Sequence, residues 1–136
     1  MIVAYRMRPM FSVRTEDMVD SQPEAASDEY FERYLARYHL TREEGLKSRW
    51  RFLTRRPTTT KIFHLLMQHG EMYQAEIARA IGRKADRVRL AVHPLQKREI
   101  VEAEIRGRRI YFRLRPSAVT QYHQLRDSHQ LHEPEQ

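Results

Sequence analysis

The sequence predicts a mainly helical domain that carries one small β-hairpin. Apolar side chains recur with the 3.6-residue spacing of an amphipathic helix over most of residues 28–97. After residue 100 the spacing changes to two residues, which indicates strands. The 136 residues include no cysteine, which excludes a disulfide framework and cysteine-ligated metal sites. A chain of this length can bury a core without such cross-links.

The part of the chain before Pro57 divides into an arm and a helical extension. Residues 1–27 hold two prolines and many polar residues, so we expect an arm that is poorly ordered unless it docks. Residues 28–57 contain two amphipathic patterns that meet at Thr41. Thr41 and Glu44 fit a capping box, in which each side chain accepts a hydrogen bond from the other residue's backbone N–H. We therefore expect two helices in this extension.

Three more helical patterns follow. The first begins at the threonines after Pro57, one of which is expected to supply the N-cap, and it ends at Gly70 in a left-handed stop. A short link leads to a second helix over residues 74–81, which Gly82 ends. The third pattern covers residues 84–97. Two helices joined by a glycine turn are therefore expected in the middle of the chain.

Residues 101–114 predict a β-hairpin of defined register. A two-residue loop at Gly107 and Arg108 brings apolar residues together on one face. The expected pairs are Val101 with Leu114, Ala103 with Phe112 and Ile105 with Ile110. A shift of one residue would break all three pairs, so the register is well specified. Ser117 is expected to cap a last helix in residues 117–136, which also hold a tail.

Positive charge concentrates in one segment. The net charge of the chain is +7, and residues 58–116 alone carry +7, from 13 basic and 6 acidic residues. Arginine supplies 21 of the 25 basic residues, and its guanidinium binds phosphate bidentately. Such a local excess is typical of a nucleic-acid-binding unit. A basic face that contacts only solvent would give the same pattern.

Residues 58–116 resemble the winged helix-turn-helix family, in particular bacterial and archaeal regulators of the ArsR and MarR type. The matching residues are Gln74-Ala75-Glu76-Ile77-Ala78-Arg79-Ala80-Ile81-Gly82, then Val88, Leu95, Ile100-Val101 and the Arg-Gly-Arg hairpin loop. In the family, a Glu-(Leu/Ile)-Ala triplet marks the first helix of the motif and the glycine marks its turn. The resemblance implies a winged helix-turn-helix domain over residues 58–116 with extra N- and C-terminal helices.

Three positions depart from the family pattern. Tyr73 stands where Ser or Thr usually caps the first helix of the motif. Glu99 stands where glycine usually precedes the wing, so either this residue adopts a strained positive φ or the turn differs from that of the family. Pro94 lies inside the predicted recognition helix. Proline removes one backbone hydrogen bond, so we expect a kink or an early end of the regular helix.

The physical case for DNA binding depends on the helix over residues 84–97. If Val88, Val92 and Leu95 face the core, the opposite face can enter the major groove of B-DNA. There arginine can bind guanine, aspartate can accept from cytosine, and leucine can contact the thymine methyl group. The wing is expected to contact the backbone or the minor groove. The predicted DNA-contacting residues are Gln74, Arg83, Lys84, Asp86, Arg87, Arg89, Leu90 and His93, and in the wing Arg106, Arg108 and Arg109.

Aromatic side chains outside the motif either complete the core or form a dimer interface, where aromatics are enriched. The two roles are compatible. The interface candidates are Tyr30, Phe31, Tyr34, Tyr38, Trp50 and Tyr122. The predicted function is a homodimeric transcriptional regulator that binds double-stranded DNA sequence-specifically.

Two other functions stay open. One is a winged-helix interaction module in a replication or chromatin assembly that binds nucleic acid non-specifically. The other is a ligand- or metal-responsive sensor, because Asp127, His129 and His132 have a spacing that could ligate zinc on one helix face. We interpret these three residues as part of a polar tail, and we expect no metal and no cofactor.

Neither enzyme activity nor membrane association is expected from the sequence. No Ser/His/Asp set, paired carboxylate motif or phosphate-binding glycine loop is present. No stretch reaches the length of a membrane span, and the N-terminus becomes charged too soon for a signal peptide. We therefore expect a cytoplasmic, nucleoid-associated protein.

Overall fold

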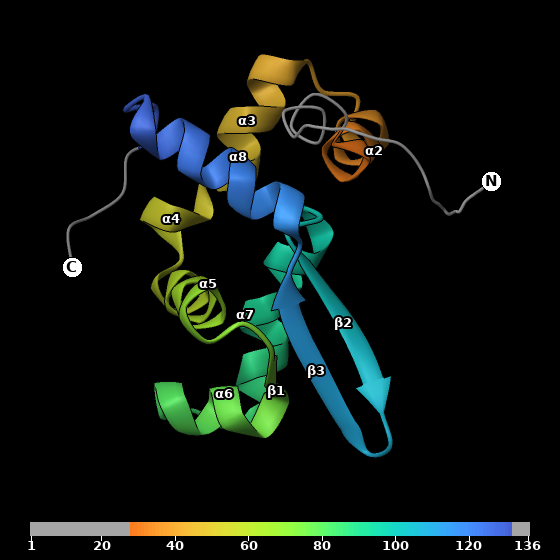
Figure 1. The fold of residues 1–136 in the computed structure, drawn as a ribbon, viewed down its shortest axis with the longest axis vertical. Coiled ribbons are helices and arrows are strands. Elements are labelled where there is room, and N and C mark those ends of the chain that lie inside the picture. The colour runs from red at the N-terminus through yellow and green to blue at the C-terminus, as the bar shows by residue number, and fades with distance from the viewer. Residues whose placement is uncertain (1–27, 132–136) are drawn as a thin grey trace, which may run out of the picture.

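The helices lie beside and above a small antiparallel sheet, whose hairpin forms one edge of the molecule and projects from its body (Figure 1). The computed structural model describes residues 28–131, so the predicted arm over residues 1–27 and the end of the predicted tail lie outside the described residues. The elements are α2 (Glu29–Tyr38), α3 (Arg42–Trp50), α4 (Phe52–Arg55), α5 (Pro57–His69), β1 (Met72–Tyr73), α6 (Gln74–Ile81), α7 (Ala85–Lys97), β2 (Val101–Arg106), β3 (Arg109–Leu114) and α8 (Pro116–Asp127). The mainly helical fold with a small hairpin is confirmed.

The N-terminal extension begins as predicted but breaks once more. The capping box is confirmed, because Glu44 N–H donates to Thr41 Oγ1 over 3.1 Å and Thr41 N–H donates to Glu44 Oε1 over 2.9 Å. The predicted second helix divides at Arg51 into α3 and α4. A straight helix would place Trp50 and Phe52 on opposite sides. The break lets both of their side chains enter the core, where their ring centroids are 6.0 Å apart.

Prolines, and not the hydroxyl residues after them, begin α5 and α8. The predicted threonine N-cap of α5 is wrong, because Pro57 is the first helical residue and Arg56 is the N-cap. In the same way Pro116 begins α8, so Ser117 does not cap it. Proline suits the first helical position, where its missing N–H would have no partner in the helix. Gly70 ends α5 as predicted, but its ψ of −108° lies outside the left-handed helical region.

The hairpin has the predicted register and one additional partner strand. Val101 pairs with Leu114, Ala103 with Phe112 and Ile105 with Ile110. The strand order is β1-β3-β2, and β1 pairs Met72 with Phe112 and Tyr73 with Tyr111. Strand β1 lies in the segment predicted to be a link, since a two-residue strand is too short to show a period. The apolar face is buried only near the base of the hairpin, and Ile105 is 74% exposed.

Most of the aromatic residues proposed for a dimer interface lie inside the single chain. The side chains of Phe31, Tyr34, Trp50 and Tyr122 are buried in the core, which corrects their assignment to an interface. Phe63 on α5 completes the cluster, with its ring centroid 5.7 Å from that of Trp50 and 5.1 Å from that of Tyr122. Of the six candidates, only Tyr30 and Tyr38 keep part of their surface exposed.

Pro94 does not end the recognition helix early. Helix α7 continues through Pro94 to Lys97, so the expected early end is wrong. The proline ring is buried, and its packing offsets the backbone hydrogen bond that it removes. Within residues 28–131 no helix is long and apolar enough to cross a membrane.

Candidate nucleic-acid interface

Helices α6 and α7 form a tightly connected pair. Gly82 ends α6 with a φ of 70°, in the left-handed region that glycine adopts without strain. Glu76, three residues after the N-cap Tyr73, supplies the reciprocal bond of a capping box, because its carboxylate accepts the Tyr73 N–H over 3.0 Å. Gln74 Nε2 donates to the Ala85 carbonyl over 2.7 Å. The amide nitrogen of Gln74, predicted to contact DNA, thus connects the starts of α6 and α7.

The two faces of α7 differ as predicted. Val88, Val92 and Leu95 are fully buried against the core. The opposite face exposes the predicted DNA-contacting side chains of α7, namely Asp86, Arg87, Arg89, Leu90 and His93. Leu90 is 65% exposed, although it is apolar and lies in the middle of the helix. An exposed leucine with arginines beside it is suited to the edges of base pairs.

The cations around the start of α7 have no acidic partner in the part of the chain that the structure describes. Arg83, Lys84, Arg87 and Arg89 are exposed, and among residues 28–131 none of them forms an ion pair. The nearby carboxylate of Asp86 accepts the backbone N–H of Arg87 over 2.9 Å. The positive charge at this end of α7 is therefore available to an external anion.

The arginines of the wing fall into two groups. The guanidinium of Arg106 pairs with Glu71 and, over 3.3 Å, with Glu104, and it lies 4.1 Å from the ring centroid of Tyr111. The guanidinium of Arg109 lies 4.3 Å from the Tyr73 ring centroid. Arg106 and Arg109 therefore have contacts within the protein as well as being candidates for a DNA contact.

Arg108, by contrast, lies in the exposed loop of the hairpin and makes no ion pair within the described part of the chain. Among the described residues Arg109 likewise has no acidic partner, but Arg108 also lacks the ring contact that Arg109 makes with Tyr73.

A carboxylate network covers the outer side of the hairpin. Arg113 is its centre, with Nε 2.6 Å from Glu102 Oε2 and NH1 3.0 Å from Glu104 Oε1 and 3.1 Å from Glu71 Oε2. Hydrogen bonds from Arg113 and Arg106 lower the pKa of the Glu104 carboxyl. The charges of this side are thus largely balanced within the protein, unlike those around α7.

The comparisons with known proteins bear on the fold. The chain matches no protein-family model and none of the curated proteins. It is similar to the crystal structure of fragment 1–100 of a possible transcriptional regulatory protein from Mycobacterium bovis. The TM-score is 0.50 and the identity 24%, over 59% of this chain and 85% of that one. The chain has a winged helix-turn-helix fold.

A second similar structure is a solution NMR structure from Mycobacterium bovis. It is described as the homodimeric winged helix-turn-helix DNA-binding domain, fragment 1–100, of a possible ArsR-family transcriptional regulator. The identity is 21%, the TM-score is 0.45, and the match covers 84% of this chain and 96% of that one.

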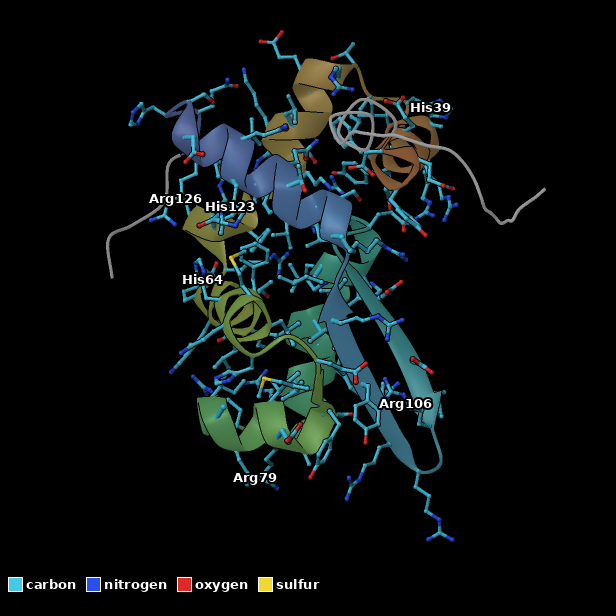
Figure 2. All side chains as sticks on the ribbon, viewed as in Figure 1. His39, His64, Arg79, Arg106, His123 and Arg126 are labelled. Atoms are coloured by element: carbon cyan, nitrogen blue, oxygen red, sulfur yellow. The ribbon has the colours of Figure 1, made fainter. Side chains whose placement is uncertain are left out.

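Two arginines that sequence reasoning missed line separate hollows beside α7. Arg79 projects from the outer side of α6 (Figure 2) and lines a shallow hollow with Arg83, Lys84 and Arg87. Arg56 precedes α5 and lies beside α7. The Arg55-Arg56 pair before Pro57 was visible in the sequence, but its position next to α7 depends on packing.

The described residues contain no group of three or more His, Cys, Asp or Glu side chains that could hold a metal ion. Asp127 and His129 are exposed at the end of α8, and His132 lies outside the described residues.

Proposed function

We propose that the protein is a homodimeric transcriptional regulator, without enzyme activity, that binds double-stranded DNA sequence-specifically. Helix α7 would enter the major groove, and the β2–β3 wing would contact the backbone or the minor groove. The observation that carries the proposal is the distribution of paired and unpaired cations. Arginines at the base of the hairpin are neutralised by carboxylates, whereas the exposed cations around α7 have no acidic partner among the described residues.

The exposed residues of α7 have distinct roles in this proposal. Arg87 and Arg89 lie on the two flanks of the exposed face, where either could bind guanine. Leu90 lies between them and can contact a thymine methyl group, and Asp86 can accept from cytosine. Arg108 supplies the wing contact, because Arg106 and Arg109 already have partners within the hairpin region.

A two-fold dimer would present two such helices to half-sites about one helical turn apart. With four of the six aromatic candidates in the core, Tyr30 and Tyr38 are the aromatic candidates left for the interface. A protein with this function would be associated with the nucleoid in the cytoplasm.

Binding-site selection from random duplex DNA tests the proposal. We expect a preferred sequence whose affinity exceeds that of random DNA by at least about 10³-fold. The control is a double variant, Arg87→Ala with Arg89→Ala, which should fold normally and lose the preference. Equal affinity of the unaltered protein for selected and random DNA would overturn sequence-specific binding.

The alternative is a winged-helix interaction module, and the exposed apolar side chains of Leu90 and Ile105 favour it. In that case Leu90 would contact a protein partner and the arginines would bind nucleic acid without sequence preference. Leu90→Ser then separates the two functions. It should weaken binding to the selected sequence if Leu90 contacts a base, and it should leave all DNA binding unchanged if Leu90 contacts a protein.

A further inference from the structure

A hollow of about 340 Å³ lies between the start of α5 and the exposed face of α7. Its lining residues are Arg56, Pro57, Thr58, Thr59, Arg83, Arg87, Leu90 and Ala91. Three of them are arginines from three different places in the chain, and none is acidic. Two of these arginines were predicted to bind DNA, whereas Arg56 belongs to the N-terminal extension.

The backbone of Arg56 is fixed at the junction of α4 and α5, and a hydrogen bond from the start of α5 connects this junction to α7. Its N–H donates to the Phe52 carbonyl and its own carbonyl accepts from Thr60 N–H, each over 2.9 Å. Thr59 Oγ1 donates to the Ala91 carbonyl over 2.7 Å, which connects the start of α5 directly to α7. The Arg56 side chain therefore begins at a defined position beside Leu90, the residue at the centre of the proposed groove contact.

No carboxylate within residues 28–131 neutralises the positive charge of the hollow. Arg56, Arg83 and Arg87 are exposed, and no ion pair to any of them occurs within residues 28–131. At the C-terminal end of α7, burial lowers the pKa of Arg98, and the positive charges of Arg56 and Arg51 lower it further.

We propose that this hollow binds a backbone phosphate of the duplex that α7 contacts, and that Arg56 is one of its ligands. The inference rests on the proposed function, because a helix in the major groove has a sugar–phosphate strand along each side. A guanidinium matches phosphate with two parallel N–H donors, so Arg56, Arg83 and Arg87 provide more donors than one phosphate needs. The N-terminal extension thereby takes part in binding DNA.

The salt dependence of DNA binding tests Arg56 directly. For a random-sequence duplex, Arg56→Gln should reduce the slope of log K against log salt by about 0.9, the value for one lost phosphate contact. Arg55→Gln is the matched control, since Arg55 is also exposed and lines a different hollow, beside α8. Arg56→Lys should restore the slope, because lysine also displaces a counterion from phosphate.

An unchanged slope for Arg56→Gln, or an equal decrease for Arg55→Gln, would overturn the inference. A folded fraction that stays constant with salt lowers the affinity without changing the slope, and circular dichroism of each variant across the salt range checks that it stays constant. Failure of the proposed function is a different result, in which the unaltered protein does not bind duplex DNA. If Arg87→Ala weakens binding while Arg56→Gln does not, only the role of Arg56 is wrong.

Discussion

The guanidinium of Arg49 donates a hydrogen bond over 2.8 Å to the backbone carbonyl of Glu99, the residue that joins the recognition helix to the wing. The same guanidinium donates to the carbonyl of Arg98 over 3.0 Å and to Gln121 Oε1 on α8 over 2.9 Å. It also lies 3.5 Å from the carboxylate of Asp28. One fully buried side chain thus connects the N-terminal extension, α8 and the base of the wing.

Arg49→Met should lower the free energy of unfolding by about 3–5 kcal/mol, because it leaves the buried Asp28 carboxylate without its cation. Urea unfolding measures the change. Arg33→Met is the control, since the Arg33 side chain is half exposed and its one ion pair within residues 28–131 is with Glu29. A loss below about 1 kcal/mol, the range of a surface ion pair, would show that Arg49 is not a structural centre.

Glu99 combines a strained backbone with two ion pairs. Its φ is 59°, as the family pattern of glycine at this position predicted. Its carboxylate lies 3.0 Å from Arg37 NH2 and 3.4 Å from Arg115 NH2. Glu99→Ala and Glu99→Gly both remove these pairs, but only glycine relieves the strain.

We therefore expect the Glu99→Gly variant to be more stable than Glu99→Ala by about 1–2 kcal/mol, the penalty of a left-handed residue with a Cβ. Thermal unfolding of the two proteins measures this difference. Equal stability would mean that the positive φ carries no strain.

Charge balance on the wing predicts a pH effect. Hydrogen bonds from Arg113, and next from Arg106, lower the pKa of the Glu104 carboxyl in the folded protein. Arg113→Gln should therefore raise the Glu104 pKa toward its ordinary value, as measured by NMR titration of the carboxyl carbon. Arg108→Gln is the control and should leave it unchanged.

The sign of the stability effect follows from the direction of the pKa shift. Since the folded pKa of Glu104 lies below the unfolded value, its carboxylate stabilises the fold above the unfolded pKa. That stabilisation is lost as the pH falls through the folded pKa. The free energy of unfolding of the Arg113→Gln variant should therefore decrease less on acidification than that of the unaltered protein. An identical decrease in both proteins would contradict this prediction.

Dimerisation is tested by light scattering at micromolar concentration, where we expect twice the chain mass of 16.5 kDa. Tyr38→Arg should weaken a dimer if the exposed ring of Tyr38 is in the interface, since it places a charge there. Lys47→Arg preserves the charge at another exposed site and serves as control. The monomer mass for the unaltered protein would overturn the homodimer.

Local patterns predicted the hairpin and the motif helices well. The register around Gly107 was predictable because three apolar pairs and a two-residue loop specify it within 14 residues. The break at Arg51 and strand β1 depend on partners far away in the sequence, so no local period marks them. The same holds for Arg56, whose place beside α7 results from the contact between Thr59 and Ala91.

The sequence also could not predict which aromatic residues are buried in the single chain. Aromatic residues are common both in interfaces and in cores, so the sequence does not distinguish these two roles for Phe31 and Trp50. Their packing does: Phe31 contacts the buried Arg49, and Trp50 contacts Phe63 and Tyr122. The guanidinium carbon of Arg49 lies 5.1 Å from the Phe31 ring centroid, an interior contact that a sequence pattern does not reveal for an arginine.

The sharpest test of base recognition is Arg89. Its side chain is exposed on α7, one turn before His93 and off the buried stripe of Val88, Val92 and Leu95. Arg89→Ala should therefore leave the free energy of unfolding nearly unchanged, since surface substitutions away from special features have small effects. At the selected sequence it should weaken binding by about 1–3 kcal/mol, the contribution of one bidentate contact to a base.

On random DNA the same substitution should have a much smaller effect, and specificity should relax at one base pair. Equal losses on both DNAs would assign Arg89 to a phosphate. Arg87→Ala is the matched comparison, because Arg87 lies on the other flank, beside Arg56 and Arg83 in the hollow. It should weaken binding to both DNAs alike and reduce the salt slope by about 0.9. If neither variant changes the ratio of specific to random affinity, α7 does not read bases and the interaction-module function replaces the regulator.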